Sequence, residues 1–313
     1  MLKGSLLHCL FLLINIPAMT QVKDSVVLEL PVGRIYGTLT VPDGKTPVPV
    51  ALFIAGSGPT DRDGNGPLTK NDALKQLGEG LNRAGIATLR YDKRGIAASA
   101  AAIKSEADLR FEDYVDDAST LVKNLKSDKR FSKVIVIGHS EGATIGLIAA
   151  QRAGAGSYVS IAGPGKRADI ILKDQLKAAL GPEAAEQASL MIDSLDRGET
   201  LTAIPPYLYS LFRPSVQPYL RSWFAYDPQE LIARLNIPVL LIQGSTDLQV
   251  NEDDAALLKK AQPKATLLII QGMNHILKHS EGDRAQNLAT YSKPELPVVP
   301  ELITAITDFI LKK

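Results

Sequence analysis

Ser140 lies in Gly138-His139-Ser140-Glu141-Gly142, a G-x-S-x-G pattern that could hold a nucleophilic serine. The pattern alone is common, but here the apolar run 133–137 leads into it and a helical pattern follows over 143–150. This is the strand, sharp turn and helix that expose a serine hydroxyl, and the two glycines let the helix pass close to the strand. The sequence therefore predicts Ser140 as a nucleophile, with a structural serine in a tight turn as the alternative.

A serine hydroxyl needs a base to take its proton, and three histidines lie beyond residue 20: His139, His275 and His279. His139 adjoins Ser140 inside the turn, so we assign it to packing. His275 follows the apolar run 266–270 and so lies just past the carboxyl end of a predicted strand, where open α/β sheets hold their ligands. We predict His275 as the general base, ahead of His279 on a possible helix face.

The base needs an acid that orients its ring, and Asp247 follows the apolar run 239–243 through a short turn. Asp253 and Asp254 lie farther along, on a predicted helix. A turn or helix-capping carboxylate is the alternative role for Asp247. The order Ser, Asp, His along the chain agrees with hydrolases that carry the G-x-S-x-G turn.

Two backbone N–H groups are predicted to form an oxyanion hole, which stabilises the negative oxygen of an acyl-transfer intermediate. Glu141 begins the helix after Ser140, where N–H groups lack partners and the helix dipole favours negative charge. The second donor should come from the loop after the strand 48–55, and we nominate Ser57, which has glycine neighbours. An ordinary strand-ending turn is the alternative.

The same loop continues as Asp61-Arg62-Asp63-Gly64-Asn65-Gly66, which fits the first half of a calcium loop with Asp72 at the twelfth position. A buried strand rather than a helix precedes it, and Asp is a poorer bidentate ligand than Glu at that position. We therefore do not expect calcium here, and acyl transfer by a serine needs neither a metal nor an organic cofactor.

The strands and helices that must position these residues are predicted to form an α/β fold. Alternating residues over 26–30 and 34–41 predict a hairpin, and continuous apolar runs predict strands buried on both faces at 48–55, 86–91, 134–138, 157–162, 239–243 and 266–270. Helical spacing lies between them at 72–84, 111–126, 142–153 and 253–261. The pattern predicts a mostly parallel central sheet with helices on both faces.

Residues 166–228 interrupt this alternation and are predicted as a helical cap insertion, which leaves 21–165 and 229–313 as the core. Seven of the chain's aromatic residues fall in this segment, too many for a surface linker. They either pack the insertion onto the sheet or line an apolar pocket. Four are candidates for substrate binding: Tyr207, Phe212, Trp223 and Phe224.

Residues 1–20 have the order of a secretory signal: Lys3, an apolar run over 6–14, and Pro17-Ala18-Met19-Thr20. A membrane anchor is the alternative, although the run is shorter than the roughly 20 residues that span a bilayer. The interpretation predicts export to a periplasm or secretion, and no stable membrane insertion once the signal is removed.

Composition excludes several classes of protein. The chain has 45% hydrophobic and 22% charged residues, which is typical of a globular body. Its net charge of +1 lacks the basic excess of a nucleic-acid binder. The single cysteine, Cys9, excludes an intramolecular disulfide framework.

Taken in order, these motifs resemble the serine α/β-hydrolase superfamily, and most of all bacterial carboxylesterases of the serine-aminopeptidase-like branch. The resemblance is carried by the loop from Ala55 to Asn65, Tyr91-Asp92-Lys93-Arg94-Gly95, the Ser140 turn, Asp247, the approach 223–228 and Asn274-His275. It implies Ser140, Asp247 and His275 as the triad and the N–H groups of Ser57 and Glu141 as the oxyanion hole. One departure is Ala97, where the family often has glycine.

The predicted activity is hydrolysis of a small-molecule carboxylic ester, with short or medium acyl or aryl groups, through an acyl-enzyme. A serine aminopeptidase or amidase of the same fold is the first alternative. A non-catalytic binding protein on this scaffold is the second, although it would have no need of a complete triad.

Overall fold

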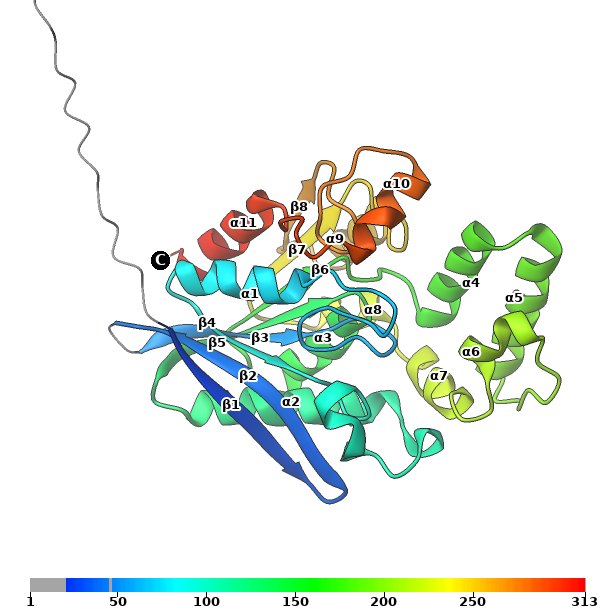
Figure 1. Ribbon diagram of the computed structural model, residues 1–313, viewed down its shortest axis with the longest axis horizontal. Coiled ribbons are helices and arrows are strands. Elements are labelled where there is room, and N and C mark those ends of the chain that lie inside the picture. The colour runs from blue at the N-terminus through cyan, green and yellow to red at the C-terminus, as the bar shows by residue number, and fades with distance from the viewer. Residues whose placement is uncertain (1–20, 45–46, 313) are drawn as a thin grey trace, which may run out of the picture.

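The computed structural model describes residues 21–44 and 47–312, so the predicted signal at residues 1–20 lies outside the described residues. Its centre is an eight-stranded sheet in the order β1-β2-β4-β3-β5-β6-β7-β8 (Figure 1). Strands β1 and β2 form an antiparallel hairpin, β2 pairs antiparallel with β4, and the other neighbours are parallel. The strands are β1 (Gln21–Leu30), β2 (Gly33–Pro42), β3 (Val48–Ile54), β4 (Ala87–Tyr91), β5 (Phe131–His139), β6 (Ser157–Ile161), β7 (Val239–Gly244) and β8 (Thr266–Ile270). The predicted mostly parallel sheet is confirmed.

Helices cover both faces of this sheet, and alternate residues of β3 show why. Leu52 packs in one apolar cluster with side chains of α2 and α3, whereas its neighbour Phe53 packs in a second cluster with α1 and α11. Successive side chains of a strand point to opposite faces, so an unbroken apolar strand serves two cores. The helices outside the insertion are α1 (Ala73–Arg83), α2 (Phe111–Ser127), α3 (Glu141–Ala153), α8 (Pro228–Ala233), α9 (Glu252–Ala261), α10 (Arg284–Ala289) and α11 (Pro300–Leu311).

Helices α4 to α7, between β6 and β7, lie to one side of the sheet (Figure 1, green to yellow). Helices α4 and α5 pack on each other, and α7 reaches α2. Phe111 of α2 stacks on Trp223 of α7, with ring centroids 6.0 Å apart. Aromatic contacts therefore join these helices to the core. The helices are α4 (Ala168–Ala179), α5 (Pro182–Asp196), α6 (Tyr209–Phe212) and α7 (Gln217–Phe224).

Short 3-10 helices occupy residues 97–102, 106–108, 206–208 and 290–292. The first begins at Ala97, whose φ of 46° lies in the left-handed region that favours glycine. The side chain of Asp92 accepts a hydrogen bond from the N–H of Ala98 at 3.1 Å, and the N–H of Gly95 donates to Ser99 at 3.0 Å. The loop thus keeps a conformation suited to glycine, although this chain has alanine there.

The calcium-like loop uses its polar groups on its own backbone and neighbours. Asp61 accepts from the N–H groups of Asp63 and Asn65 at 2.8 and 2.9 Å. Asn65 donates to Asp72 at 2.8 Å, and Asp63 pairs with Arg90. Over 21–44 and 47–312 no group of three or more His, Cys, Asp or Glu side chains could hold a metal ion. Hydrogen bonding within the loop accounts for this sequence pattern.

None of the helices in the described ranges is long and apolar enough to cross a membrane.

Candidate active site

Ser140 occupies a strained turn between β5 and α3. Its φ of 56° and ψ of −126° are uncommon for a residue with a side chain. A Cβ on Gly138 would lie 2.2 Å from the carbonyl oxygen of Gly142, and one on Gly142 would lie 2.2 Å from that of Ile54. Both glycines are therefore required by close backbone approach, and the turn presents the serine side chain above the sheet.

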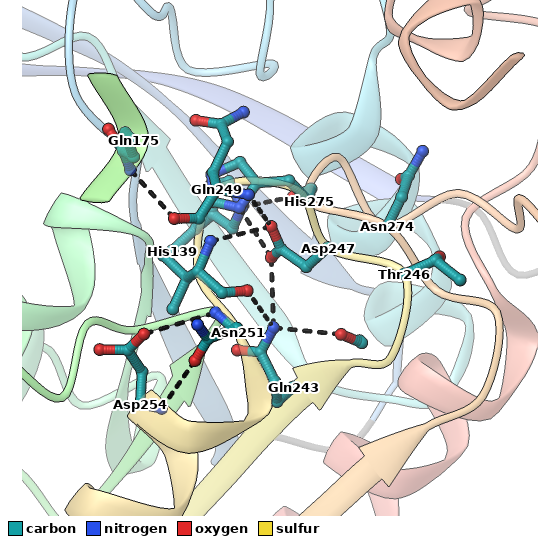
Figure 2. Close-up of polar contacts among 12 residues, drawn as sticks. His139, Gln175, Gln243, Thr246, Asp247, Gln249, Asn251, Asp254, Asn274 and His275 are labelled. Carbon is teal, nitrogen blue, oxygen red and sulfur yellow. Dashed lines mark hydrogen bonds and ion pairs between the residues drawn. The ribbon is translucent and has the colours of Figure 1, made fainter. Parts of the chain in front are cut away.

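His275 and Asp247 are brought together from two neighbouring strand ends. Asp247 follows β7 and His275 follows β8, and the Nδ1 atom of His275 lies 2.8 Å from Oδ2 of Asp247. Figure 2 shows the two side chains facing each other beside Gln249. Since Nδ1 is used in this contact, Nε2 is the ring nitrogen available to accept a proton from a serine.

Asp247 is almost fully buried, with 1% of its side chain exposed, yet it stays ionised. Burial alone would raise its pKa, but the adjacent His275 and hydrogen bonds to the carboxylate outweigh it and hold the pKa below its ordinary value. The N–H groups of Gln249 and Val250 donate to Oδ1 at 2.8 and 3.1 Å. The loop after β7 thus fixes Oδ1, while Oδ2 faces His275 and also accepts from the side-chain amide of Gln243 at 3.3 Å.

A small cavity of about 140 Å³ is lined by Ser140, His275 and Ser57 together. A larger cavity of about 550 Å³ is lined by Ser57, Glu141 and side chains of helices α4 and α7. Ser57 borders both cavities. The predicted nucleophile and base line the small cavity, and the two predicted oxyanion-hole residues line the larger one.

The backbone N–H groups of Ser57 and Glu141 make no hydrogen bond with any other described residue. Gly56 brings this loop against the nucleophile, because a Cβ at Gly56 would lie 3.1 Å from Cβ of Ser140. Two free donors next to a serine side chain are what an oxyanion hole requires.

His139 contacts the predicted base, a relationship that sequence reasoning missed. Its Nε2 lies 2.8 Å from the backbone oxygen of His275, and the two rings are 4.8 Å apart between centroids. Burial, together with the nearby His275, lowers the pKa of His139 to about 3. His139 is therefore neutral at ordinary pH, and its ring N–H donates to the His275 carbonyl.

The burial of His139 makes the fold sensitive to acid. Because the pKa of His139 is lowered in the folded protein, the unfolded chain binds more protons between about pH 3 and 6.5, and stability falls as pH falls through that window. On going from pH 7.5 to 5.0, we expect the wild type to lose about 1–2 kcal/mol more unfolding free energy than His139→Gln, which keeps a donor and does not titrate. Urea unfolding of both proteins at both pH values measures this, and equal losses would contradict it.

The four aromatic residues nominated for substrate binding lie in different surroundings. Trp223 borders the larger cavity, whereas Phe212 and Phe224 are buried in the core and Tyr207 is 53% exposed. The latter three do not border either cavity. Tyr114 of α2 and Tyr219 of α7 do line the larger cavity, and sequence reasoning gave neither this role.

Comparison with known proteins finds similarity to a hydrolase family and to an esterase. Residues 68–165 match the family described as serine aminopeptidase, S33. The chain is 33% identical over 272 residues to Esterase EstD of Thermotoga maritima, covering 85% of this chain and 62% of that protein. It therefore spans less than two thirds of the length of this relative.

Solved structures share the fold at low sequence identity. Est1E from Butyrivibrio proteoclasticus has a TM-score of 0.59 at 16% identity, covering 92% of this chain and 99% of its own. An alpha-beta serine hydrolase homologue from Coxiella burnetii has a TM-score of 0.51 at 16% identity, covering 90% and 96%. The Pyrococcus furiosus esterase Pf2001 has a TM-score of 0.53 at 15% identity, covering 93% and 92%. The predicted α/β-hydrolase fold and the resemblance to serine hydrolases are confirmed.

Proposed function

From the α/β-hydrolase fold of this chain and its similarity to the S33 serine aminopeptidase family and to an esterase, we propose that it is a serine carboxylesterase. One observation carries the proposal. The Nδ1 atom of His275 lies 2.8 Å from Asp247, and His275 and Ser140 line the same cavity. This is the arrangement that turns a serine hydroxyl into a nucleophile.

In the proposed mechanism, Oγ of Ser140 attacks the ester carbonyl carbon while Nε2 of His275 takes its proton. The carbonyl oxygen becomes negative and is held by the N–H groups of Ser57 and Glu141. The bond to the alcohol oxygen then breaks, His275 returns the proton to the departing alcohol, and the acyl group stays on Ser140. Water, deprotonated by His275, attacks the acyl carbon. The bond to Ser140 then breaks, the acid leaves, and His275 returns the proton to the Ser140 oxygen.

We propose that residues 166–228 act as a cap and that the larger cavity beneath it receives the apolar part of the ester. Its volume is about 550 Å³, and many of its side chains are apolar. Such a pocket suits short or medium acyl chains and aryl groups. These apolar residues include Ile103, Leu172, Leu176, Val216, Leu220 and Trp223.

Peptidase activity is the second candidate, favoured by the description of the matched family. An aminopeptidase needs an unpaired acidic group for the free amine of its substrate. Two carboxylates border the larger cavity, and each is paired with a cation: Glu106 with Arg213 at 2.9 Å, and Glu141 with Lys93 at 2.9 Å. The eight acidic residues of the cap border neither cavity; they are Asp169, Asp174, Glu183, Glu186, Asp193, Asp196, Glu199 and Asp227. Because each carboxylate at the cavity is paired with a cation, none is free to bind a substrate amine, and this supports an ester as substrate.

The two activities are separated by initial rates on p-nitrophenyl esters of increasing acyl length and on an aminoacyl p-nitroanilide. We expect ester turnover at least 100-fold above anilide turnover, with a maximum at short or medium chains, because paired carboxylates leave no site for a free amine. Anilide turnover equal to or above ester turnover would move the assignment to peptidase.

We also propose export of the protein, which is supported by the signal-like order of residues 1–20. Mass spectrometry of the protein recovered from its native host should give a chain that starts near residue 21. An intact N-terminus on the active protein would contradict export by cleavage.

A further inference from the structure

Lys93 lies beside the proposed oxyanion hole and is buried, with 1% of its side chain exposed. Its ammonium donates to the carbonyl oxygen of Gly56 at 2.6 Å and to Oε2 of Glu141 at 2.9 Å. It also lies 4.8 Å from the centre of the Tyr114 ring. Burying a lysine and a glutamate together is costly in free energy and commonly adds little stability, so their placement next to Ser140 calls for another explanation.

The contact with Gly56 acts on the peptide group that contains the Ser57 donor. The carbonyl of Gly56 and the N–H of Ser57 belong to one planar peptide unit, in which the two bonds point in opposite directions. Holding the oxygen therefore fixes the direction of the N–H. A charged donor on the oxygen also polarises the unit and strengthens the N–H as a donor.

The contact with Glu141 acts on the second donor. The backbone N–H of Glu141 is the other member of the proposed hole, and its side chain is anchored at both oxygens. Lys93 binds Oε2, and the hydroxyl of Tyr219 donates to Oε1 at 2.6 Å. Burial raises the pKa of Tyr219 well above its ordinary value, so the hydroxyl keeps its proton. Tyr219 belongs to α7, so the cluster also ties the cap to the hole.

We propose that Lys93 is a positioning residue for the oxyanion hole, because its one buried ammonium orients both the Gly56–Ser57 peptide and Glu141. This inference rests on the proposed esterase function. Lys93 borders the larger cavity but not the small one that Ser140 and His275 line. It therefore acts through the two N–H donors rather than on the substrate carbonyl.

The test compares Lys93→Met and the double variant Lys93→Met/Glu141→Gln, which leaves no unpaired buried charge. The control is Lys126→Met, which removes a lysine bonded at 2.8 Å to the carbonyl of Ala153, far from Ser140 in the fold. We expect kcat on p-nitrophenyl acetate to fall about 10- to 100-fold in both Lys93 variants, with KM within threefold. The control should match the wild type.

A second readout is the affinity for phenylboronic acid, measured by calorimetry. Its boron bonds to the Ser140 oxygen, giving a tetrahedral anion that mimics the intermediate while His275 holds the released proton. Affinity should fall by the same factor as kcat, because the hole binds this anion and not the ground state. A general loss of packing would not produce this parallel.

Folded Lys93 variants with kcat and boronate affinity within threefold of the wild type would overturn the inference, as would a change in KM alone. A double variant that does not fold would also overturn it, because the cluster would then serve the fold as a whole. Absence of ester turnover in the wild type would reject the proposed function, and the boronate comparison, which needs no turnover, would still decide the role of Lys93.

Discussion

Ser140→Ala is expected to lower kcat/KM for p-nitrophenyl esters by about 10⁴-fold or more while leaving the fold intact. The hydroxyl oxygen is the atom that forms the acyl bond, so no other group at the site replaces it. The Oγ atom makes no hydrogen bond with another described residue, and the strained backbone at φ 56° is the same with alanine as with serine. Initial rates and thermal unfolding of the purified variant measure the two effects.

Ser119→Ala is the matched control for that experiment. Ser119 is a buried serine of α2 whose hydroxyl donates to the carbonyl of Val115 at 2.7 Å. Its loss should alter stability slightly and leave the rate unchanged. Ester turnover in Ser140→Ala within tenfold of the wild type would mean that another residue is the nucleophile.

Asp247→Asn is expected to lower kcat by about 10³- to 10⁴-fold. The side-chain oxygen of asparagine can still accept from the N–H groups of Gln249 and Val250, so its NH₂ group turns toward Nδ1 of His275. That nitrogen then has to accept, the ring proton moves to Nε2, and His275 can no longer take a proton from Ser140. The rate falls although the geometry is kept.

The control is Asp253→Asn, which changes an exposed carboxylate on α9. Full activity is expected there, since that carboxylate does not contact His275. An Asp247→Asn rate within tenfold of the wild type would show that the imidazole does not depend on this carboxylate for its tautomer.

Much of the fold could be predicted because buried parallel strands leave a strong signal. Runs such as 134–138 and 239–243 are apolar on both faces, and each corresponds to an observed strand, β5 and β7. The positions of the strand ends were enough to predict that Asp247 and His275 lie close together, because the carboxyl ends of parallel strands meet at one edge of a sheet. Their 2.8 Å contact agrees with that argument.

The cluster around Lys93 could not be predicted, because its contacts join distant parts of the chain. Gly56 lies 37 residues away from Lys93, Glu141 lies 48 residues away, and Tyr219 is 78 residues beyond Glu141. A single buried charge leaves no periodic pattern in the sequence, and a lysine is normally predicted to lie on the surface because most lysines in proteins are exposed. For Glu141, sequence reasoning considered the backbone N–H alone.

The aromatic residues of the cap illustrate a second limit. Phe224 in the core and Trp223 at the cavity are neighbours in sequence and similar in chemistry. The rotation of α7 against α2 decides which of the two side chains faces the larger cavity. That rotation cannot be predicted from the composition of the segment. His139 is a related case, since its contact with His275 depends on how two strand ends approach each other.

The most direct test of the account is labelling with a fluorophosphonate, which forms a stable bond to an activated serine oxygen with loss of fluoride. If Ser140 is the nucleophile, peptide mass spectrometry will find one label per chain, on Ser140, and no label on Ser140→Ala. Ester turnover will be lost in proportion to labelling. A label on a different residue, or full ester turnover in completely labelled protein, would contradict Ser140 as the nucleophile.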